Sequence, residues 1–189
     1  MLGRLQAAAI TALLLAINAH GEELAAGRLL IATAKSQDPD FAKSVVLLIH
    51  CDDQGAIGLM LNRPSKASLA AVFPDLPAAK ERTEIVYSGG PVSLGIRALL
   101  RSAVKPEGGI PLTPHVYALA RKTLLERTIA AKLPSSAFRV YVGYSGWSAT
   151  QLRNELSQEL WRIARADASL VFDPKPESLW ERVSRSSKR

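Results

Sequence analysis

Two apolar runs joined by a short polar turn most restrict how this chain can fold. The first run, Val45–His50, is continuous and rich in β-branched side chains, which favours a strand buried on both faces. Residues 52–55 (Asp-Asp-Gln-Gly) have turn chemistry, and Ala56–Leu61 is a second apolar run. We therefore expect a β-hairpin over residues 45–61. Residues 62–64 (Asn-Arg-Pro) end it, because proline cannot donate a hydrogen bond to a strand ladder.

The rest of the chain mixes strands and helices without a regular alternation, and its 189 residues favour one domain. This mixture predicts an α+β fold with flanking helices on a mixed, largely antiparallel sheet. Ser148 and Gln151 form a capping box that begins a helix, whose buried face we assign to Leu152, Leu156, Leu160 and Ile163. The other expected strands are Leu29–Thr33, Glu84–Tyr87, Ile96–Ser102, Val116–Ala120, Phe138–Tyr144 and Leu170–Phe172; the other expected helices are Leu69–Phe73, Arg121–Lys132 and Glu177–Val183, and Lys105–Pro114 is an expected loop.

The first 21 residues predict a secretory signal peptide. Arg4 is the only charge among them, an apolar run extends from Ala7 to Ile17, and Ala19 and Gly21 are small residues placed as before a cleavage site. The run is too short to span a bilayer, which takes about 20 apolar residues. We expect cleavage after Gly21, a single soluble domain over residues 22–189 and a periplasmic or secreted location. The alternative is an uncleaved N-terminal helix on a cytoplasmic protein.

The basic charge of the chain does not by itself indicate nucleic-acid binding. Lys and Arg total 24 against 17 for Asp and Glu, which gives a formal net charge of +7. The charges are scattered, apart from a basic C-terminal tail at about residues 184–189. No expected helix carries a stripe of Arg and Lys, and aromatic residues do not alternate with basic ones as in a base-stacking platform. We find no intrinsic nucleic-acid motif.

No residue set in the sequence makes a convincing catalytic or metal centre. Ser145 follows a strand and precedes a helix, as a hydrolase nucleophile does, but Trp147 replaces the second glycine of the G-x-S-x-G pattern. His50 and Cys51 are neighbours on a strand, where successive side chains point to opposite faces and cannot pair. Beyond the signal peptide the histidines are His50 and His115, which lack the spacing of metal ligands. We therefore expect no enzymatic activity, no cofactor and no metal.

Several short motifs follow one another along the chain. They are Gly27-x-Leu29-Leu30-Ile31-Ala32, Asp38-Pro39-x-Phe41, Ser44 to His50, Gly55-Ala56-Ile57-Gly58-Leu59, Leu61 to Pro64, Gly89-Gly90-Pro91-Val92, Gly143-Tyr144-x-Gly146-Trp147, Gln151-Leu152 and Glu155, followed by Trp161, Phe172 and Trp180. Together, over about residues 27–180, they resemble the bacterial YqgE/AlgH family. Several motifs in one order are more specific than any single motif.

The resemblance implies an α+β fold with a coiled, bifurcated sheet. It transfers no catalytic residues, because the biochemical activity of the family is not established. One member is linked to transcriptional control of alginate synthesis. The family more often has alanine than serine at the position of Ser145, which weakens the case for a nucleophile. This chain departs from the family in its signal-like N-terminus and in Ser93–Ser102, which match poorly.

Six residues of these motifs are candidates for one ligand-binding groove. Arg63 offers a guanidinium fork for an anion, while Tyr144 and Trp147 offer apolar walls with polar tips. The competing explanation is structural, because glycine and proline set the backbone angles at bends of a coiled sheet. The six candidates are Asn62, Arg63, Tyr144, Trp147, Gln151 and Glu155.

From these features we expect an exported, non-enzymatic binding or regulatory module whose partner is a protein or a small molecule. The first alternative is a transcriptional regulator that is associated with DNA in the cytoplasm. The second alternative is a hydrolase that uses Ser145.

Overall fold

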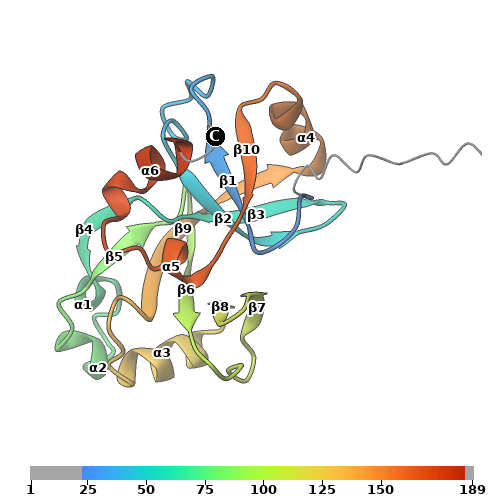
Figure 1. Ribbon diagram of the computed structural model, residues 1–189. Helices are drawn as coiled ribbons and strands as arrows, with labels where there is room; N and C mark the ends of the chain where they lie inside the picture. The colour runs from blue at the N-terminus through green and yellow to red at the C-terminus, as the bar shows by residue number, and fades with distance from the viewer. Residues whose placement is uncertain (1–22, 186–189) are drawn as a thin grey trace, which may run out of the picture.

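The strands of the chain form one branched sheet, which the computed structural model describes over residues 23–185 (Figure 1). The strands are β1 (Arg28–Ala32), β2 (Val45–Cys51), β3 (Gly55–Met60), β4 (Pro64–Ser68), β5 (Ile85–Ser88), β6 (Val92–Arg101), β7 (Ile110–Thr113), β8 (Val116–Leu119), β9 (Phe138–Ser148) and β10 (Trp161–Arg165). The helices are α1 (Leu69–Val72), α2 (Pro77–Lys80), α3 (Lys122–Ala130), α4 (Ala149–Ser157), α5 (Ala168–Val171) and α6 (Leu179–Arg185), with one 3-10 turn, Pro176–Ser178.

The main path of the sheet runs β10-β1-β2-β3-β9-β6-β8-β7, and β5, which carries β4, joins it at β9. The pairing of β5 with β9 is parallel, while the other pairings along the described chain are antiparallel. The predicted α+β fold with a mixed, largely antiparallel sheet is confirmed. The signal peptide predicted for residues 1–21 lies outside the described residues.

Strand β9 is the point at which the sheet divides. Its last part, Ser145–Ser148, pairs with β3, whereas Tyr141 and Val142 pair with β5. Between these parts Gly143 adopts φ +75°, and a Cβ atom there would lie 2.6 Å from the carbonyl oxygen of Val92. Only glycine accepts both the left-handed backbone and this close approach. The glycine therefore allows one strand to serve two branches of the sheet.

The predicted β-hairpin is confirmed as β2 and β3. Asp52 forms its turn, because Oδ1 accepts hydrogen bonds from the backbone N–H groups of Gln54 (2.9 Å) and Gly55 (3.1 Å). Strand β2 is buried on both faces, since alternate side chains enter two different apolar clusters. Pro64 begins β4, where a missing N–H is tolerated at an edge strand.

The strand predicted over Leu170–Phe172 is wrong, because Leu170 and Val171 belong to α5 and Phe172 is the C-cap of this helix. The side chain of Asp167 caps the helix by accepting hydrogen bonds from the backbone N–H groups of Ser169 (2.7 Å) and Leu170 (2.9 Å). The side-chain cap stabilises the helical turn. This stabilisation outweighs the preference of three apolar residues for an isolated strand.

The helix that begins at Ser148 is shorter than predicted. The capping contact is confirmed, because the Ser148 hydroxyl accepts a hydrogen bond from the Gln151 N–H at 3.1 Å. Helix α4 ends at Ser157, and Glu159 has a left-handed φ of +57°. Leu160 therefore lies outside the helix and Ile163 lies on β10, although their spacing continues the helical pattern of Leu152 and Leu156.

Other strand boundaries also differ from the predictions. Strand β9 continues to Ser148 rather than ending at Tyr144, so Ser145 lies within this strand and does not follow it. Strand β6 begins at Val92 rather than Ile96, because its pairing with β9 is shifted between these residues by a bulge. The bulge exposes Leu94, so the run lacks a simple alternation. The predicted loop Lys105–Pro114 contains the short edge strand β7.

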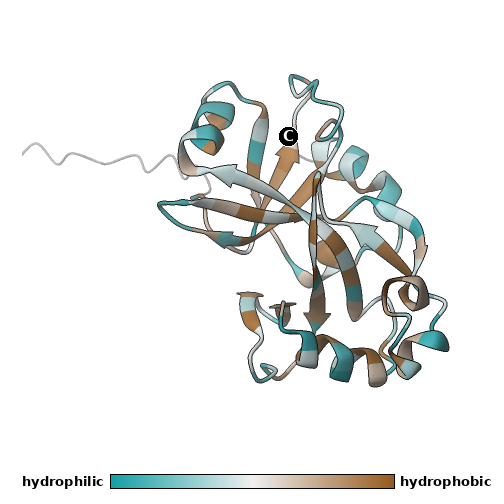
Figure 2. Ribbon diagram, turned by 180° about the vertical axis from the view of Figure 1, so that it is seen from behind, coloured by the Kyte–Doolittle hydropathy of each residue, from teal (hydrophilic) through white to brown (hydrophobic). Residues whose placement is uncertain are grey.

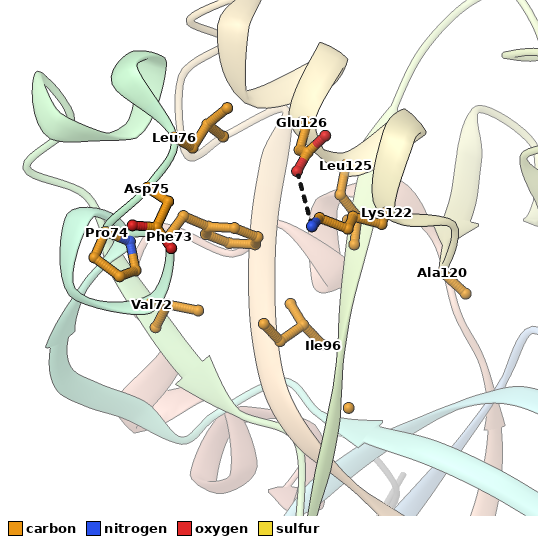
Figure 3. A pocket seen from close by; sticks show the side chains of 11 residues that line it. Val72, Phe73, Pro74, Asp75, Leu76, Ile96, Ala120, Lys122, Leu125 and Glu126 are labelled. Carbon is orange, nitrogen blue, oxygen red and sulfur yellow. Dashed lines mark ion pairs between the residues drawn. The ribbon is translucent and has the colours of Figure 1, made fainter.

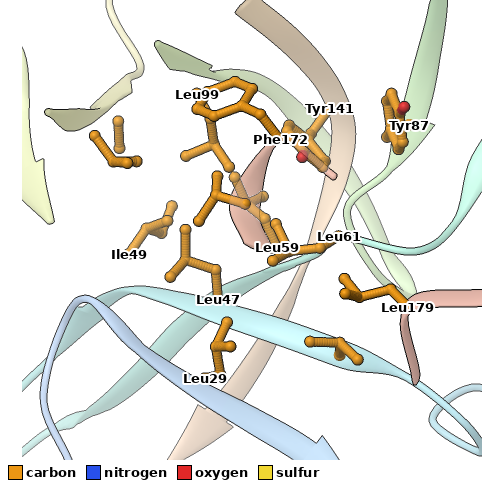
Figure 4. Packing of buried hydrophobic residues seen from close by; sticks show 14 of the residues in the cluster. Leu29, Leu47, Ile49, Leu59, Leu61, Tyr87, Leu99, Tyr141, Phe172 and Leu179 are labelled. Atoms are coloured by element: carbon orange, nitrogen blue, oxygen red, sulfur yellow. The ribbon is translucent and has the colours of Figure 1, made fainter. Parts of the chain in front are cut away.

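The apolar core is divided among three clusters around the branched sheet, and apolar residues concentrate along its strands (Figure 2). In the first cluster, Leu29 and Leu47 from neighbouring strands pack with Phe172 and Leu179 from the C-terminal segment (Figure 4). Trp180 adds a hydrogen bond from its indole N–H to the carbonyl oxygen of Ala32 at 2.7 Å. The C-terminal segment is therefore an integral part of the fold.

Candidate functional site

A hollow of about 730 Å³ with a mainly apolar lining lies between the α1–α2 connection and α3 (Figure 3). Phe73 and Leu76 approach it from one side, Leu125 comes from α3 on the other, and Ile96 of β6 lies at the base. We call this hollow the apolar groove. It is lined by Val72, Phe73, Pro74, Asp75, Leu76, Gly95, Ile96, Ala120, Lys122, Leu125 and Glu126.

Two very short helices hold one wall of the apolar groove. The hydroxyl of Ser68 caps α1 by accepting a hydrogen bond from the Ala71 N–H at 3.2 Å. Helix α1 ends at Val72. Pro77 is the first residue of α2, where the backbone N–H has no partner within the helix, so proline is tolerated there. Phe73, which follows α1, is therefore held half-buried at the mouth of the groove.

Three charged side chains lie around the apolar lining. Lys122 and Glu126, one turn apart on α3, form a loose ion pair of 3.8 Å. Asp75 lies on the opposite wall and is exposed. The groove thus combines an apolar base with a few polar groups at its edge, a composition typical of small-molecule sites.

A second hollow of about 370 Å³ is lined by Arg63, one of the six predicted site residues. Its neighbour Asn62 is buried and acts within the fold. The Asn62 Oδ1 accepts the N–H of Val45 (2.9 Å), and Nδ2 donates to the carbonyl oxygen of Lys43 (2.9 Å). Arg63 donates from Nη2 to the carbonyl oxygen of Ala42 at 2.6 Å.

Three of the predicted residues meet in a hydrogen-bonded network around one carboxylate. Oε2 of Glu155 accepts the indole N–H groups of Trp147 (2.9 Å) and Trp161 (2.7 Å), and Oε1 accepts the side-chain N–H of Gln151 (2.8 Å). Phe41 packs against both indoles, with ring centroids 5.3 and 5.5 Å away. Both tryptophans are buried, so the Glu155 carboxylate is occupied by hydrogen bonds from side chains of the protein itself.

Tyr144 lies at a third hollow of about 310 Å³, which it shares with Trp147, His50 and Asp52. The Arg97 guanidinium lies 4.8 Å from the centre of the Tyr144 ring. This hollow has no lining residue in common with the one at Arg63. The structure therefore does not bring the six predicted residues into one groove, and their role in ligand binding stays a prediction.

The side chains considered for catalysis are held in structural contacts. Ser145 is completely buried, and its hydroxyl donates to the carbonyl oxygen of Gly89 at 3.2 Å. His50 Nε2 contacts Asp52 Oδ2 at 2.9 Å, and backbone N–H groups of the turn, first that of Gln54, lower the pKa of Asp52. Burial and the Asp52 charge raise the pKa of the Cys51 thiol, which disfavours the reactive thiolate.

Over residues 23–185, no group of three or more His, Cys, Asp and Glu side chains is arranged to hold a metal ion. No helix in this part of the chain is both long and apolar enough to cross a bilayer.

The apolar groove was not predicted from the sequence. Its lining comes from four separate segments, near residues 72–76, 95–96, 120 and 122–126. The available signal was the apolar run Leu69–Phe73 followed by Pro-Asp-Leu-Pro, which places apolar side chains beside a turn. That pattern alone indicates a short amphipathic helix and no particular partner.

Comparisons with known proteins identify the family. A family model described as AlgH-like matches residues 29–188. The AlgH protein of Pseudomonas aeruginosa, named as a UPF0301 protein, is 36% identical over 166 residues and is matched over 85% of each chain. A UPF0301 protein of Streptomyces coelicolor is 35% identical over 165 residues and is matched over 84% of each chain.

Solved structures agree with this assignment. The solution structure of Pseudomonas aeruginosa AlgH has a TM-score of 0.68 at 32% identity, covering 86% of this chain and 87% of that one. A crystal structure of a protein from Corynebacterium diphtheriae has a TM-score of 0.73 at 23% identity, covering 87% and 88% of the two chains, and shows the same fold. The resemblance inferred from the motifs is confirmed, and the chain belongs to the AlgH-like family of UPF0301 proteins.

Proposed function

We propose that this chain is a non-enzymatic binding module that holds a small apolar or amphiphilic molecule in the apolar groove. The observation that carries the proposal is the groove itself. Its volume of about 730 Å³ lies among those of small-molecule sites, which span roughly 300–1,000 Å³. Burial of ligand surface against Phe73, Ile96 and Leu125 supplies the affinity, and the charged rim orients a polar end.

The state of the candidate nucleophiles supports the non-enzymatic part of this proposal. A serine nucleophile needs an exposed hydroxyl with a base beside it. The Ser145 hydroxyl is instead enclosed and donates to a backbone carbonyl. The thiol of Cys51 is held toward its protonated form.

The proposal is tested by filling the groove. Ala120 is exposed and lines it, so Ala120→Trp places a large side chain in the ligand's space without changing the core. Ala103 is also exposed but lies outside the lining, and Ala103→Trp is the matched control. The probe is a neutral naphthylamine dye whose fluorescence rises in apolar surroundings.

We expect saturable dye binding to the wild-type chain and to Ala103→Trp. Ala120→Trp is expected to weaken it by about tenfold or more. Equal binding by all three proteins, or no saturable binding by the wild type, contradicts the proposal.

We further propose that the protein acts outside the cytoplasm after removal of residues 1–21. The apolar run Ala7–Ile17 and the small residues before Glu22 support this. The test is the N-terminal sequence and cellular fraction of the native protein. A chain that starts at Glu22 in the envelope fraction agrees with the proposal. A cytosolic chain that retains Met1 overturns it and favours the DNA-associated regulator, which predicts salt-dependent, sequence-selective DNA binding.

A further inference from the structure

The hollow at Arg63 is lined by one basic and one acidic residue. Arg63 and Asp40 both line it, together with Ser88 and backbone near Gly90. Among residues 23–185, neither charged group makes an ion pair within 4.0 Å. We call this hollow the polar hollow. Its two charges are of opposite sign, so it is electrically balanced as a whole.

The guanidinium of Arg63 is fixed in place but only partly used. One N–H of Nη2 donates to the carbonyl oxygen of Ala42, which is its single hydrogen bond within the described chain. The adjacent Asn62 ties the same loop through the carbonyl oxygen of Lys43 and the N–H of Val45. The remaining donors of the fork are therefore available to a ligand in the hollow that Arg63 lines.

Prolines, a backbone hydrogen bond and close packing restrain the backbone around the polar hollow. Pro39 and Pro91 form part of its lining. The N–H of Ser88 donates to the carbonyl oxygen of Arg63 at 2.8 Å. Gly90 packs so closely on β9 that a Cβ atom would lie 2.3 Å from Ser145 Oγ. A ligand therefore finds a preorganised site and does not pay for ordering a loop.

We propose that the polar hollow binds a small zwitterion that carries both a carboxylate and an ammonium group, as a free α-amino acid does. The Arg63 fork matches a carboxylate, to which it donates parallel N–H bonds. Asp40 attracts the ammonium group and repels a ligand that is only an anion. The volume of about 370 Å³ accommodates a molecule of this size. The site shares no lining residue with the apolar groove, so the two proposals stand or fall separately.

The test is an amide NMR titration of the full chain with L-alanine, propionate and ethylamine. Propionate keeps only the carboxylate of alanine, and ethylamine keeps only the ammonium group. We expect saturable shifts of the Ser88 and Gly90 amides with L-alanine, and binding of each partial analogue that is about tenfold weaker or more. The amide of Gly95, in the apolar groove, is expected not to move.

Variants assign the two charges. Arg63→Gln and Asp40→Asn are each expected to weaken L-alanine binding by about tenfold or more. The control is Arg153→Gln, which removes an exposed positive charge on α4 and is expected to change nothing. Asp40 is exposed, so Asp40→Asn tests the proposal even if Arg63→Gln disturbs the loop that contains Arg63.

Three results overturn the proposal. The first is an absence of saturable shifts at Ser88 and Gly90. The second is propionate binding as tight as that of L-alanine, which identifies a plain anion site. The third is an Asp40→Asn variant that binds L-alanine like the wild type.

Discussion

Glu155 and Trp161 are joined by a hydrogen bond of 2.7 Å from the indole N–H to Oε2, across the junction between α4 and β10. The same oxygen accepts the indole N–H of Trp147 on β9. One carboxylate therefore ties a helix to two strands that lie far apart in the sheet order. Because both indoles are buried, their N–H groups depend on this single acceptor.

Glu155→Leu is expected to lower the free energy of unfolding by about 2 kcal/mol or more, because it leaves two buried N–H donors without an acceptor. Glu159→Gln is the control, since it removes an exposed ion pair with Lys35 and is expected to cause no measurable change. Urea unfolding followed by tryptophan fluorescence measures both. Equal losses for the two variants contradict the structural role of Glu155.

Leu47→Ala is expected to cost about 2–5 kcal/mol of stability, because Leu47 is completely buried in the first apolar cluster. Leu94→Ala is the matched control, since Leu94 is 72% exposed on the β6 bulge. Its effect is expected to stay within about 0.5 kcal/mol. The urea midpoint should shift for Leu47→Ala alone.

The Arg82–Glu84 pair predicts a component of acid sensitivity. Glu84 accepts two hydrogen bonds from the buried Arg82 (2.8 and 2.6 Å), which lower the pKa of Glu84 from its ordinary value of 4.5. Between the lowered pKa of Glu84 in the folded state and its ordinary value of 4.5, the unfolded state binds more protons than the folded state. The stabilisation from this pair is therefore fully present above pH 4.5 and is lost as the pH falls through the folded-state pKa of Glu84. Glu84→Gln should flatten the decline of the unfolding midpoint below that pH. Parallel wild-type and variant curves would show that the pair adds nothing.

Gly143→Ala is expected to lower stability by more than about 1 kcal/mol, because a left-handed backbone is unfavourable for alanine and its Cβ meets the carbonyl oxygen of Val92. Gly146→Ala lies on the same strand without a positive φ, and its nearest neighbour is a Tyr144 ring atom 3.2 Å away. A smaller loss is expected there. Thermal unfolding of the two variants provides the comparison, and a similar loss at both positions would remove the special role of Gly143.

The parts of the fold that were predictable from sequence are those set by nearby residues. The β2–β3 hairpin follows from two apolar runs and the turn of Asp52, and α4 follows from the cap at Ser148. The order of the strands was not predictable, because β9 pairs with β3, β5 and β6 through contacts between distant residues. No local pattern reports such a register.

The candidate sites divide in the same way. Arg63 was predicted because its guanidinium can hold an anion, and it lines the polar hollow. Trp147 and Glu155 were also predicted as site residues, but the buried Trp147 donates a hydrogen bond to Glu155, which gives both a role within the fold. The apolar groove is formed by side chains such as Ile96 that look like ordinary core residues until their neighbours are placed.

The branching of the sheet at β9 also determines when the chain can fold during its synthesis. Strand β1 has its outer partner in β10, and β3 and β5 both require β9, so most of the chain must be made before these strands find their neighbours. Pairing between such distant segments is slow to form. Local pairs such as β2–β3 and β7–β8 can form early, whereas the two branches of the sheet join only after β9 has been made.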